Sequence, residues 1–126
     1  MTTGARYTVV RKIASGGMAE IYLGTQHGAA GFERPIVIKR IRPEFSASAQ
    51  FQTMLQDEAR IAMGMHHGNV VQVLDLGTSG GQWFLVLELV DGWDVDTLLR
   101  RATAAGIAFP PSLALYVTAQ VCRALQ

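Results

Sequence analysis

The sequence contains a single cysteine, Cys122, among its 126 residues. One cysteine can neither form an internal disulfide nor supply the paired thiolates of a Cys-based zinc site. Charged residues make up only 17% of the chain, and the formal net charge is +1. A net charge this small creates no field that attracts polyanions, which argues against nucleic acid as the main partner.

Long apolar runs are also missing. The longest, from Trp83 to Val90, is interrupted by Glu88 and is too short to cross a bilayer. The first six residues lack the apolar core of a secretory signal peptide. Hydrophobic residues still make up 49% of the chain, which is enough for one domain with a modest core and too many for a disordered segment. We therefore expect a soluble, cytoplasmic protein without a membrane segment.

Hydrophobic periodicity predicts three strands, one helix, two further strands and then two helices. The predicted strands are 7–13, 20–26, 35–42, 70–76 and 83–89, with a hairpin turn at 77–81. The first predicted helix is capped by Ser46 or Ser48 and continues to about residue 65, and the later helices are 95–104 and 111–126. This order predicts an α+β fold, in which a five-stranded antiparallel sheet with one packed helix precedes a helical region. We place the boundary at residue 90, which gives domains 1–90 and 91–126.

A segment of small residues, Ala14-Ser15-Gly16-Gly17-Met18-Ala19, follows the first predicted strand. The next residues alternate like a strand, so the segment is predicted to be a hairpin tip and not the helix N-terminus of a dinucleotide-binding fold. Small residues at such a tip let backbone N–H groups approach phosphate oxygens. An ordinary hairpin turn is the alternative interpretation.

Two opposite charges occupy positions where apolar residues are expected. Lys39 shares a strand face with Val37 and Ile41. Glu58 falls on a helical stripe that also contains Phe51, Met54, Leu55, Ile61, Ala62 and Met65, and it has no basic residue three or four positions away. Each charge is costly to bury alone, so the pattern predicts that the two form an ion pair. In the alternative, Lys39 reaches outward to solvent and Glu58 lies at the edge of the helix.

From about Tyr7 to the last residue, these motifs resemble the eukaryotic-like serine/threonine protein kinases of bacteria. The resemblance implies an N-terminal lobe in which Lys39 orients the ATP phosphates and Glu58 holds Lys39. The ATP-binding positions that it implies are Ile13, Ala14, Gly16, Gly17, Ala19, Ile21, Val37, Lys39, Leu87, Glu88, Val90 and Asp94. The sequence departs from the family pattern in having Ala14 and Ala19 at two glycine places and Val37 at a usual alanine.

At the segment resembling the kinase hinge, the resemblance gives Leu87 the gatekeeper place. It also implies that Glu88 and Val90 present the backbone carbonyl and N–H groups that recognise adenine. Asp94 matches a polar position near the ribose, although it equally suits the N-cap of the helix that follows.

The catalytic-loop H-R-D-x-x-x-x-N and the metal-binding D-F-G of kinases do not occur after this hinge. Asp75-Leu76-Gly77 is similar to D-F-G, but it precedes the hinge strand, and we assign it no metal. We therefore expect the ATP-binding portion of a kinase that transfers the ATP γ-phosphate to protein Ser or Thr. This portion should be inactive alone, and Mg²⁺ is expected only in a complete kinase domain.

The last predicted helix has an apolar face that includes Leu113, Val117 and Val121. In a kinase this helix lies inside the larger lobe, so the face predicts self-association or a partner that supplies the missing lobe. Besides ATP, a protein substrate is the other partner that the resemblance implies. Two alternatives remain: a non-catalytic nucleotide-binding or protein-interaction module, and a structural remnant that binds no ligand.

Overall fold

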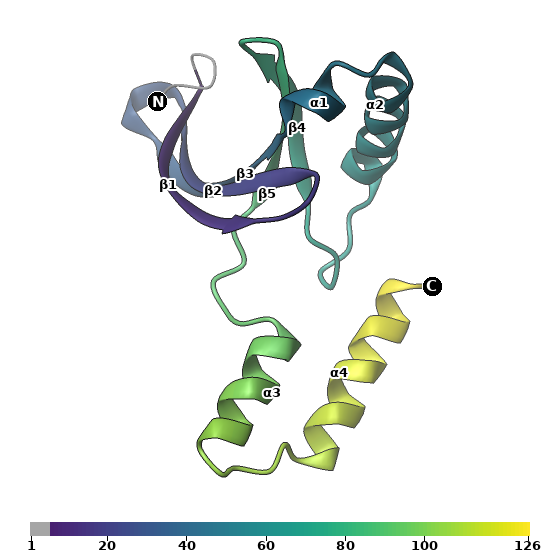
Figure 1. Cartoon of the computed structure of the whole chain (residues 1–126). Helices are drawn as coiled ribbons and strands as arrows, with labels where there is room; N and C mark the ends of the chain where they lie inside the picture. The colour runs from purple at the N-terminus through teal and green to yellow at the C-terminus, as the bar shows by residue number, and fades with distance from the viewer. Residues whose placement is uncertain (1–5) are drawn as a thin grey trace. The chain divides into compact units, whose positions relative to one another are not determined.

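The computed structural model describes residues 6–126 (Figure 1). Its elements are β1 (Tyr7–Ser15), β2 (Ala19–His27), the 3-10 turn η1 (Ala29–Gly31), β3 (Glu33–Ile41), α1 (Pro43–Ser46), α2 (Ala49–Gly64), β4 (Val73–Ser79), β5 (Gln82–Glu88), α3 (Val95–Ala104) and α4 (Pro111–Ala124). The stretch 1–5, on which the signal-peptide expectation mainly rests, lies outside the described residues.

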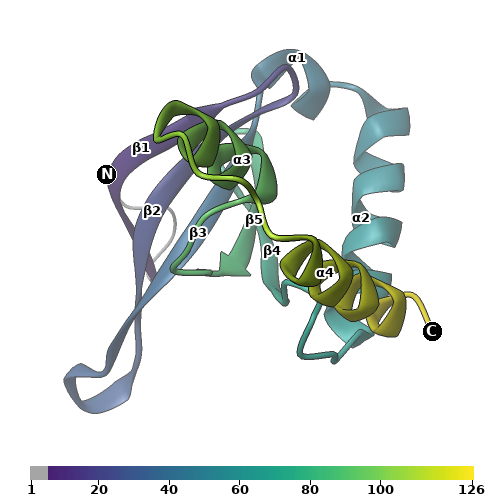
Figure 2. The same cartoon turned by 90° about the horizontal axis from the view of Figure 1, so that it is seen from below.

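The strands form an antiparallel sheet in the order β1-β2-β3-β5-β4 (Figure 1 and Figure 2). Strands that follow one another in the chain pair as β1 with β2, β2 with β3, and β4 with β5. Strand β3 also pairs with β5, which comes after α1, α2 and β4 in the chain. The predicted α+β fold, with a five-stranded antiparallel sheet, a packed helix and further helices, is confirmed. The short helix α1 was not predicted; it starts at Pro43, whose fixed φ angle suits a first helical position.

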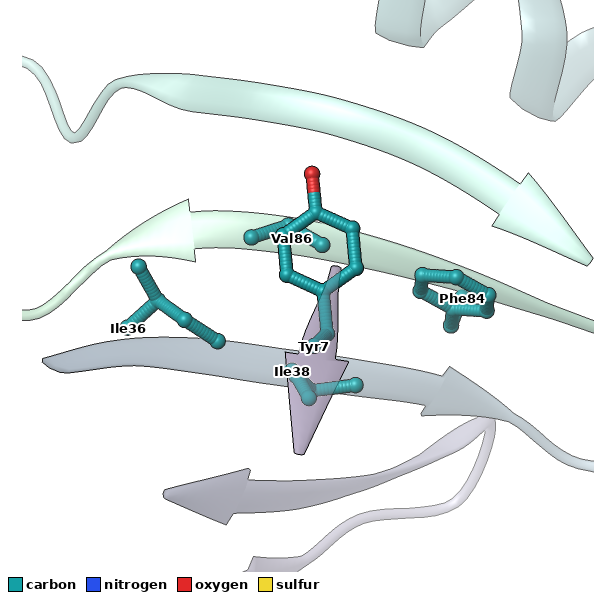
Figure 3. Packing of buried hydrophobic residues seen from close by; sticks show 5 residues of the cluster. All are labelled: Tyr7, Ile36, Ile38, Phe84 and Val86. Carbon is teal, nitrogen blue, oxygen red and sulfur yellow. The ribbon is translucent and has the colours of Figure 1, made fainter. Parts of the chain in front are cut away.

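The central strand β3 supplies side chains to both faces of the sheet. Ile36 and Ile38 are fully buried on one face, whereas Ile41 is buried on the other, as the alternation of a strand requires. The cluster on the first face consists of Tyr7, Ile36, Ile38, Phe84 and Val86 (Figure 3). The second cluster brings Ala19, Ile41 and Leu55 together. The sheet therefore has an apolar core on each side.

The helix α2 packs against β4 and begins with an N-cap in which Phe51 N donates to the Ser48 hydroxyl over 3.3 Å. Its buried residues are Leu55 and Ala59, four positions apart on one face. The stripe predicted from the sequence coincides with this face only in part: Leu55 belongs to both, and Phe51 packs against the same cluster. Met54 and Ile61, which were expected to point at the core, are 47% and 67% exposed.

The turn between β4 and β5 is shorter than the predicted range 77–81. Strand β4 continues to Ser79, and Gly80 (φ +58°) and Gly81 (φ +80°) form the turn. Positive φ at both central residues is typical of a tight two-residue hairpin, and glycine adopts it without strain. Gly77 lies inside the strand, where a Cβ atom would approach Phe84 Cζ to 2.7 Å.

The chain divides into two compact units. One unit takes in the chain up to His66 together with Val71–Leu89, and the other consists of His67–Val70 and Val90–Gln126. The second unit contains α3 and α4, neither of which buries a residue. Within it, the Asn69 side-chain amide donates to Gln120 O over 2.9 Å. Among residues 6–126, no helix combines the length and apolar character needed to cross a membrane.

Candidate functional site

The segment of small residues forms the tip of the β1–β2 hairpin, as predicted. Strand β1 ends at Ser15 and β2 begins at Ala19, so only Gly16, Gly17 and Met18 lie in the connection. The Gly16 N–H donates to Ala19 O over 2.9 Å and closes the turn. A helix does not follow, and the dinucleotide-binding arrangement is therefore excluded for this loop.

Two backbone N–H groups at this tip have no hydrogen-bond partner in the part of the chain that the structure describes. Within residues 6–126, neither the Gly17 N–H nor the Met18 N–H makes a hydrogen bond. A Cβ atom on Gly17 would meet nothing within 4 Å, so the space beside this residue is open. Successive free amides at a turn form a concave group of donors that suits an anion.

A hollow of about 360 Å³ borders the same tip. Its lining consists of Gly16, Gly17, Met18, Ala19, Ile21 and Lys39. Lys39 reaches it from β3, where it pairs in register with Ile21 of β2 and Leu85 of β5. The side chain of Lys39 is half-buried and makes no ion pair or hydrogen bond with the described part of the chain. An unpaired ammonium and free amide donors thus border one hollow.

The predicted ion pair between Lys39 and Glu58 is not formed. Glu58 is exposed, and among residues 6–126 its carboxylate lies within 4.0 Å of no cationic group. The physical reason is the orientation of α2, in which Leu55 and Ala59 occupy the packing face. Glu58, one position before Ala59 and therefore about 100° around the helix, faces away from that packing.

A second row of apolar residues lies next to Lys39 on the sheet. Val37 pairs in register with Leu23 of β2 and Leu87 of β5. Because residues two apart on a strand share a face, Val37 and Leu87 lie on the side of the sheet that holds Lys39. Ile13 is 42% exposed on β1, and Ala14 pairs with Ile21. Val37 and Leu87 thus lie one cross-strand row from Lys39, and Ala14 lies opposite Ile21, which lines the hollow, whereas Ile13 falls at an irregularity in the pairing of β1 with β2.

The predicted hinge residues are divided between the two units. In the first, Glu88 forms a reciprocal contact with Gln72: Glu88 N donates to Gln72 O over 3.0 Å, and Gln72 N donates to the Glu88 carboxylate over 2.9 Å. Val90 belongs to the second unit and is exposed.

Asp94 also belongs to the second unit, where it caps α3. Its Oδ1 atom accepts a hydrogen bond from Thr97 N over 2.6 Å. Because this N–H stabilises the charged carboxylate, the pKa of Asp94 lies below its ordinary value. The N-cap interpretation of Asp94 is confirmed.

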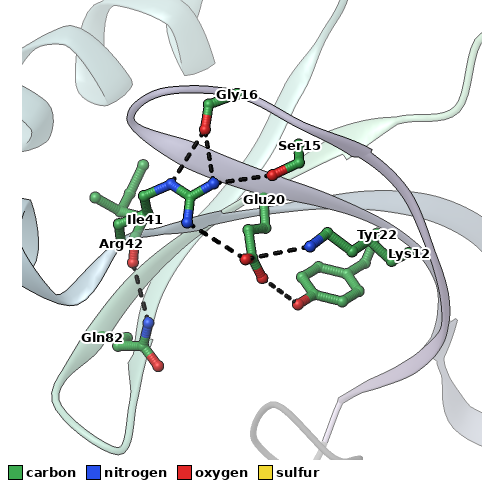
Figure 4. Close-up of polar contacts among 8 residues, drawn as sticks. All are labelled: Lys12, Ser15, Gly16, Glu20, Tyr22, Ile41, Arg42 and Gln82. Carbon is green, nitrogen blue, oxygen red and sulfur yellow. Dashed lines mark hydrogen bonds and ion pairs between the residues drawn. The ribbon is translucent and has the colours of Figure 1, made fainter.

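A polar network behind the hairpin tip was not predicted from the sequence (Figure 4). Arg42, directly after β3, donates through Nε and Nη2 to Gly16 O over 3.1 and 2.8 Å, and through Nη2 to the Ser15 hydroxyl over 2.8 Å. Its Nη1 atom lies 3.5 Å from Glu20, and Lys12 Nζ lies 3.2 Å from the same carboxylate. The sequence offered one signal for this network: Glu20 lies near the start of β2, and the opposite charge of Arg42 lies directly after β3.

Glu20 connects this network to β2. Its carboxylate accepts a hydrogen bond from the Tyr22 hydroxyl over 2.6 Å. This bond, helped by the Lys12 ammonium, lowers the pKa of Glu20. The same bond to an anionic acceptor raises the pKa of the Tyr22 phenol. The carboxylate is therefore held in its charged form beside Arg42.

Comparison with known proteins places this geometry in a family. The family described as protein tyrosine and serine/threonine kinase matches residues 7–126. The chain belongs to the protein kinase family.

Two named relatives of this kinase chain come from bacteria. It is 41% identical over 119 residues to tyrosine-protein kinase MasK of Myxococcus xanthus, covering 94% of the chain and 18% of MasK. It is 33% identical over 109 residues to serine/threonine-protein kinase PknF of Mycobacterium tuberculosis, covering 86% of the chain and 22% of PknF. The chain spans about a fifth of the length of these curated relatives.

Among solved structures, the crystal structure of the Mycobacterium tuberculosis PknI kinase domain superposes with a TM-score of 0.77 and 29% identity. The superposition covers 98% of this chain and 48% of the PknI domain. The kinase fold of the N-terminal lobe is thus shown for this chain, which spans about half the length of that solved domain.

The two alanines that stand at glycine places of the kinase pattern, Ala14 and Ala19, lie in the regular strands β1 and β2. Ala14 pairs with Ile21, and Ala19 is 4% exposed and packs with Ile41 and Leu55. Within residues 6–126, Ala30 is the only non-glycine residue with positive φ, so neither alanine is strained. The methyl group of Ala19 belongs to the core, which gives a physical reason for alanine at this place in this kinase.

Proposed function

We propose that this chain binds ATP in the hollow at the β1–β2 hairpin tip and is the nucleotide-binding portion of a protein kinase. The observation that supports this most directly is the lining of the hollow. Lys39 and two backbone N–H groups without partners in the described residues, those of Gly17 and Met18, border one space. An ammonium and free amides are the groups that bind phosphate oxygens.

The apolar row beside Lys39 suits the rest of the nucleotide. Val37 and Leu87 face the same side of the sheet as Lys39, one cross-strand row away. A flat aromatic base binds well to apolar side chains, whereas its phosphates require charge and donors. Polar and apolar groups are therefore arranged in the order that a nucleoside phosphate presents them.

The proposal assigns no catalysis to this segment alone. Its sequence contains neither the H-R-D nor the D-F-G segment after residue 90. A positioned general base contributes typically ~10²–10⁴-fold to a reaction, and this segment supplies none. The hollow has no carboxylate in its lining, and no group of three His, Cys, Asp or Glu in residues 6–126 could hold a metal ion. These residues do not fit Mg²⁺, and we derive no step through it.

The phosphoacceptor of the whole protein is proposed to be Ser or Thr. Support comes from relatives such as PknF and Pkn2, both named as serine/threonine kinases, whereas MasK is named as a tyrosine kinase. Phosphoamino-acid analysis of a substrate labelled by the whole protein tests this. Phosphoserine or phosphothreonine is expected, and phosphotyrosine alone would contradict it.

Nucleotide binding is tested by titrating the chain with ATP in a calorimeter. Lys39→Met is expected to weaken ATP binding about tenfold or more, because it removes a charge-assisted contact to phosphate. Lys12, the other lysine of the chain, lies on β1 and is absent from the lining of the hollow, so Lys12→Met is the matched control. Equal ATP affinity of the wild type and Lys39→Met would refute the proposed site.

A second function, protein interaction, is favoured by helix α4. Leu113 and Val121 of its apolar face are 40% and 51% exposed. Sedimentation at rising concentration is expected to show self-association that Val121→Lys abolishes. Leu115, 72% exposed and about 160° from Leu113 around the helix, provides the matched control Leu115→Lys. A chain that stays monomeric at all concentrations would argue against self-association.

A further inference from the structure

We propose that Arg42 is a positioning residue that fixes the tip of the β1–β2 hairpin in the conformation needed to bind phosphate. The inference rests on the proposed nucleotide site and adds to it a residue that does not line the hollow. Arg42 lies on the opposite side of the tip, where it borders a separate small cavity together with Glu20, Arg40 and Gln82.

Arg42 holds the tip through both its side chain and its backbone. Gly16 O accepts from Nε and Nη2, the Ser15 hydroxyl lies 2.8 Å from Nη2, and Arg42 N donates to Met18 O over 2.9 Å. A planar guanidinium can make such paired bonds in a fixed geometry, which a lysine ammonium cannot. One residue thus contacts the tip at Ser15 and Gly16 (Figure 4) and also at Met18.

Arg42 is itself held in place. The following Pro43 favours an extended backbone at Arg42, whose ψ angle is 149°. Arg42 O accepts from Phe45 N over 3.1 Å and from Ser46 N over 3.0 Å at the start of α1. The Glu20 carboxylate, 3.5 Å from Nη1, provides an opposite charge beside the guanidinium. The tip is therefore attached to a residue with a fixed backbone and an ionic partner.

The consequence for phosphate follows from the planarity of the peptide bond. In a trans peptide, the N–H of Gly17 points opposite to the C=O of Gly16. Because Arg42 binds Gly16 O, the Gly17 N–H points away from Arg42, and Gly17 lines the hollow that Lys39 also borders. Fixing this carbonyl thereby fixes the direction of a free donor, and a donor oriented before binding loses less entropy when the anion arrives.

The test compares Arg42→Met with Arg42→Lys and the control Lys12→Met. Lys12 also contacts Glu20, but it makes no bond to Gly16, so its loss should leave the tip in place. Two measurements are made on the chain: hydrogen exchange of the Gly16 amide without nucleotide, and the affinities for ATP and for adenosine. Adenosine lacks the phosphates, so a tip that acts only on phosphate should not affect its binding.

We expect Arg42→Met to exchange the Gly16 amide about tenfold faster and to bind ATP about tenfold more weakly, because the lost bonds are charge-assisted. Adenosine affinity should not change. Arg42→Lys should recover only part of the loss, and Lys12→Met should resemble the wild type.

Unchanged exchange in Arg42→Met, or an equal loss of ATP and adenosine affinity, would overturn the inference. In the second case Arg42 would support the whole fold and not the tip. If the wild type binds neither ATP nor adenosine, the proposed nucleotide binding is refuted separately from the role of Arg42. The exchange measurement still decides whether Arg42 fixes the tip.

Discussion

The Tyr7 hydroxyl donates a hydrogen bond to Asp75 Oδ2 over 2.6 Å, joining β1 and β4, the two edge strands of the sheet. The Tyr7 ring packs among Ile36, Ile38, Phe84 and Val86 (Figure 3). A bond between residues 68 positions apart can form only because the sheet curls strongly enough to bring its edges within reach of one side chain. The carboxylate of Asp75, which resembles the first residue of a D-F-G motif in the sequence, thus has a structural partner.

Tyr7→Phe is expected to lower the free energy of unfolding by about 1–2 kcal/mol, because it removes a bond to a charged acceptor and retains the buried ring. Denaturant unfolding measures the change. Tyr22→Phe is the matched control, since Tyr22 also donates over 2.6 Å to a carboxylate, that of Glu20, but within its own strand. An equal loss of unfolding free energy in Tyr22→Phe would show that the bond between the two edge strands stabilises the fold no more than a bond within one strand.

Stability is expected to fall at high pH through the same phenol. Burial, with the hydrogen bond to Asp75, raises the pKa of Tyr7 to about 12, whereas an unfolded tyrosine titrates near 10. Because the folded pKa is the higher one, this contribution is fully present below about pH 10 and is lost as the pH rises towards 12.

Absorbance titration of tyrosinate, combined with unfolding at each pH, measures this effect. Tyr7→Phe should remove the titration step near pH 12 and flatten the decline in stability. A folded chain in which all three tyrosines titrate near pH 10 would contradict the assigned pKa.

Gly77→Ala is expected to destabilise the sheet by about 1–3 kcal/mol, because a Cβ atom there would lie 2.7 Å from the Phe84 ring in a packed core. Gly64→Ala, at the end of α2, would place its Cβ atom in open space and should be neutral or slightly stabilising. Thermal unfolding of both variants tests the comparison. Equal melting temperatures would mean that Phe84 moves aside without cost.

Glu58→Gln is expected to leave the ATP affinity unchanged, because Glu58 is exposed and does not contact Lys39. The calorimetric titration used for Lys39→Met measures it, with Lys39→Met as the positive control. A loss for Glu58→Gln comparable to that for Lys39→Met would show that α2 rotates on nucleotide binding and forms the ion pair predicted from the sequence.

Local patterns predicted most of the fold. Alternating apolar residues located the strands, and the small residues from Ala14 to Ala19 located the hairpin tip, because both signals arise from neighbouring positions. The same signals were less accurate in predicting where turns begin and end. Gly77 was assigned to a turn, but it is a strand residue whose missing side chain makes room for Phe84. This reason depends on a neighbour across the sheet.

The orientation of α2 could not be read from its apolar residues. The predicted face included Leu55, which is buried, but also Met54, Ile61 and Met65, which are exposed, whereas Ala59, which was not assigned to that face, is buried. Hydrophobicity along a helix with apolar residues on several sides does not decide which side meets the sheet. Arg42 was missed because its contacts depend on how the end of β3 meets the tip of another hairpin.

The burial of Ala19 has a mechanical consequence. Its methyl group packs both at the base of the hairpin tip, which we propose to face phosphate, and with Leu55 of α2, through the common neighbour Ile41. Close-packed interiors transmit displacements, so a partner that tilts the helix would also shift the end of the tip. A signal arriving at the outer surface of α2 could in this way alter nucleotide affinity without any contact with the nucleotide.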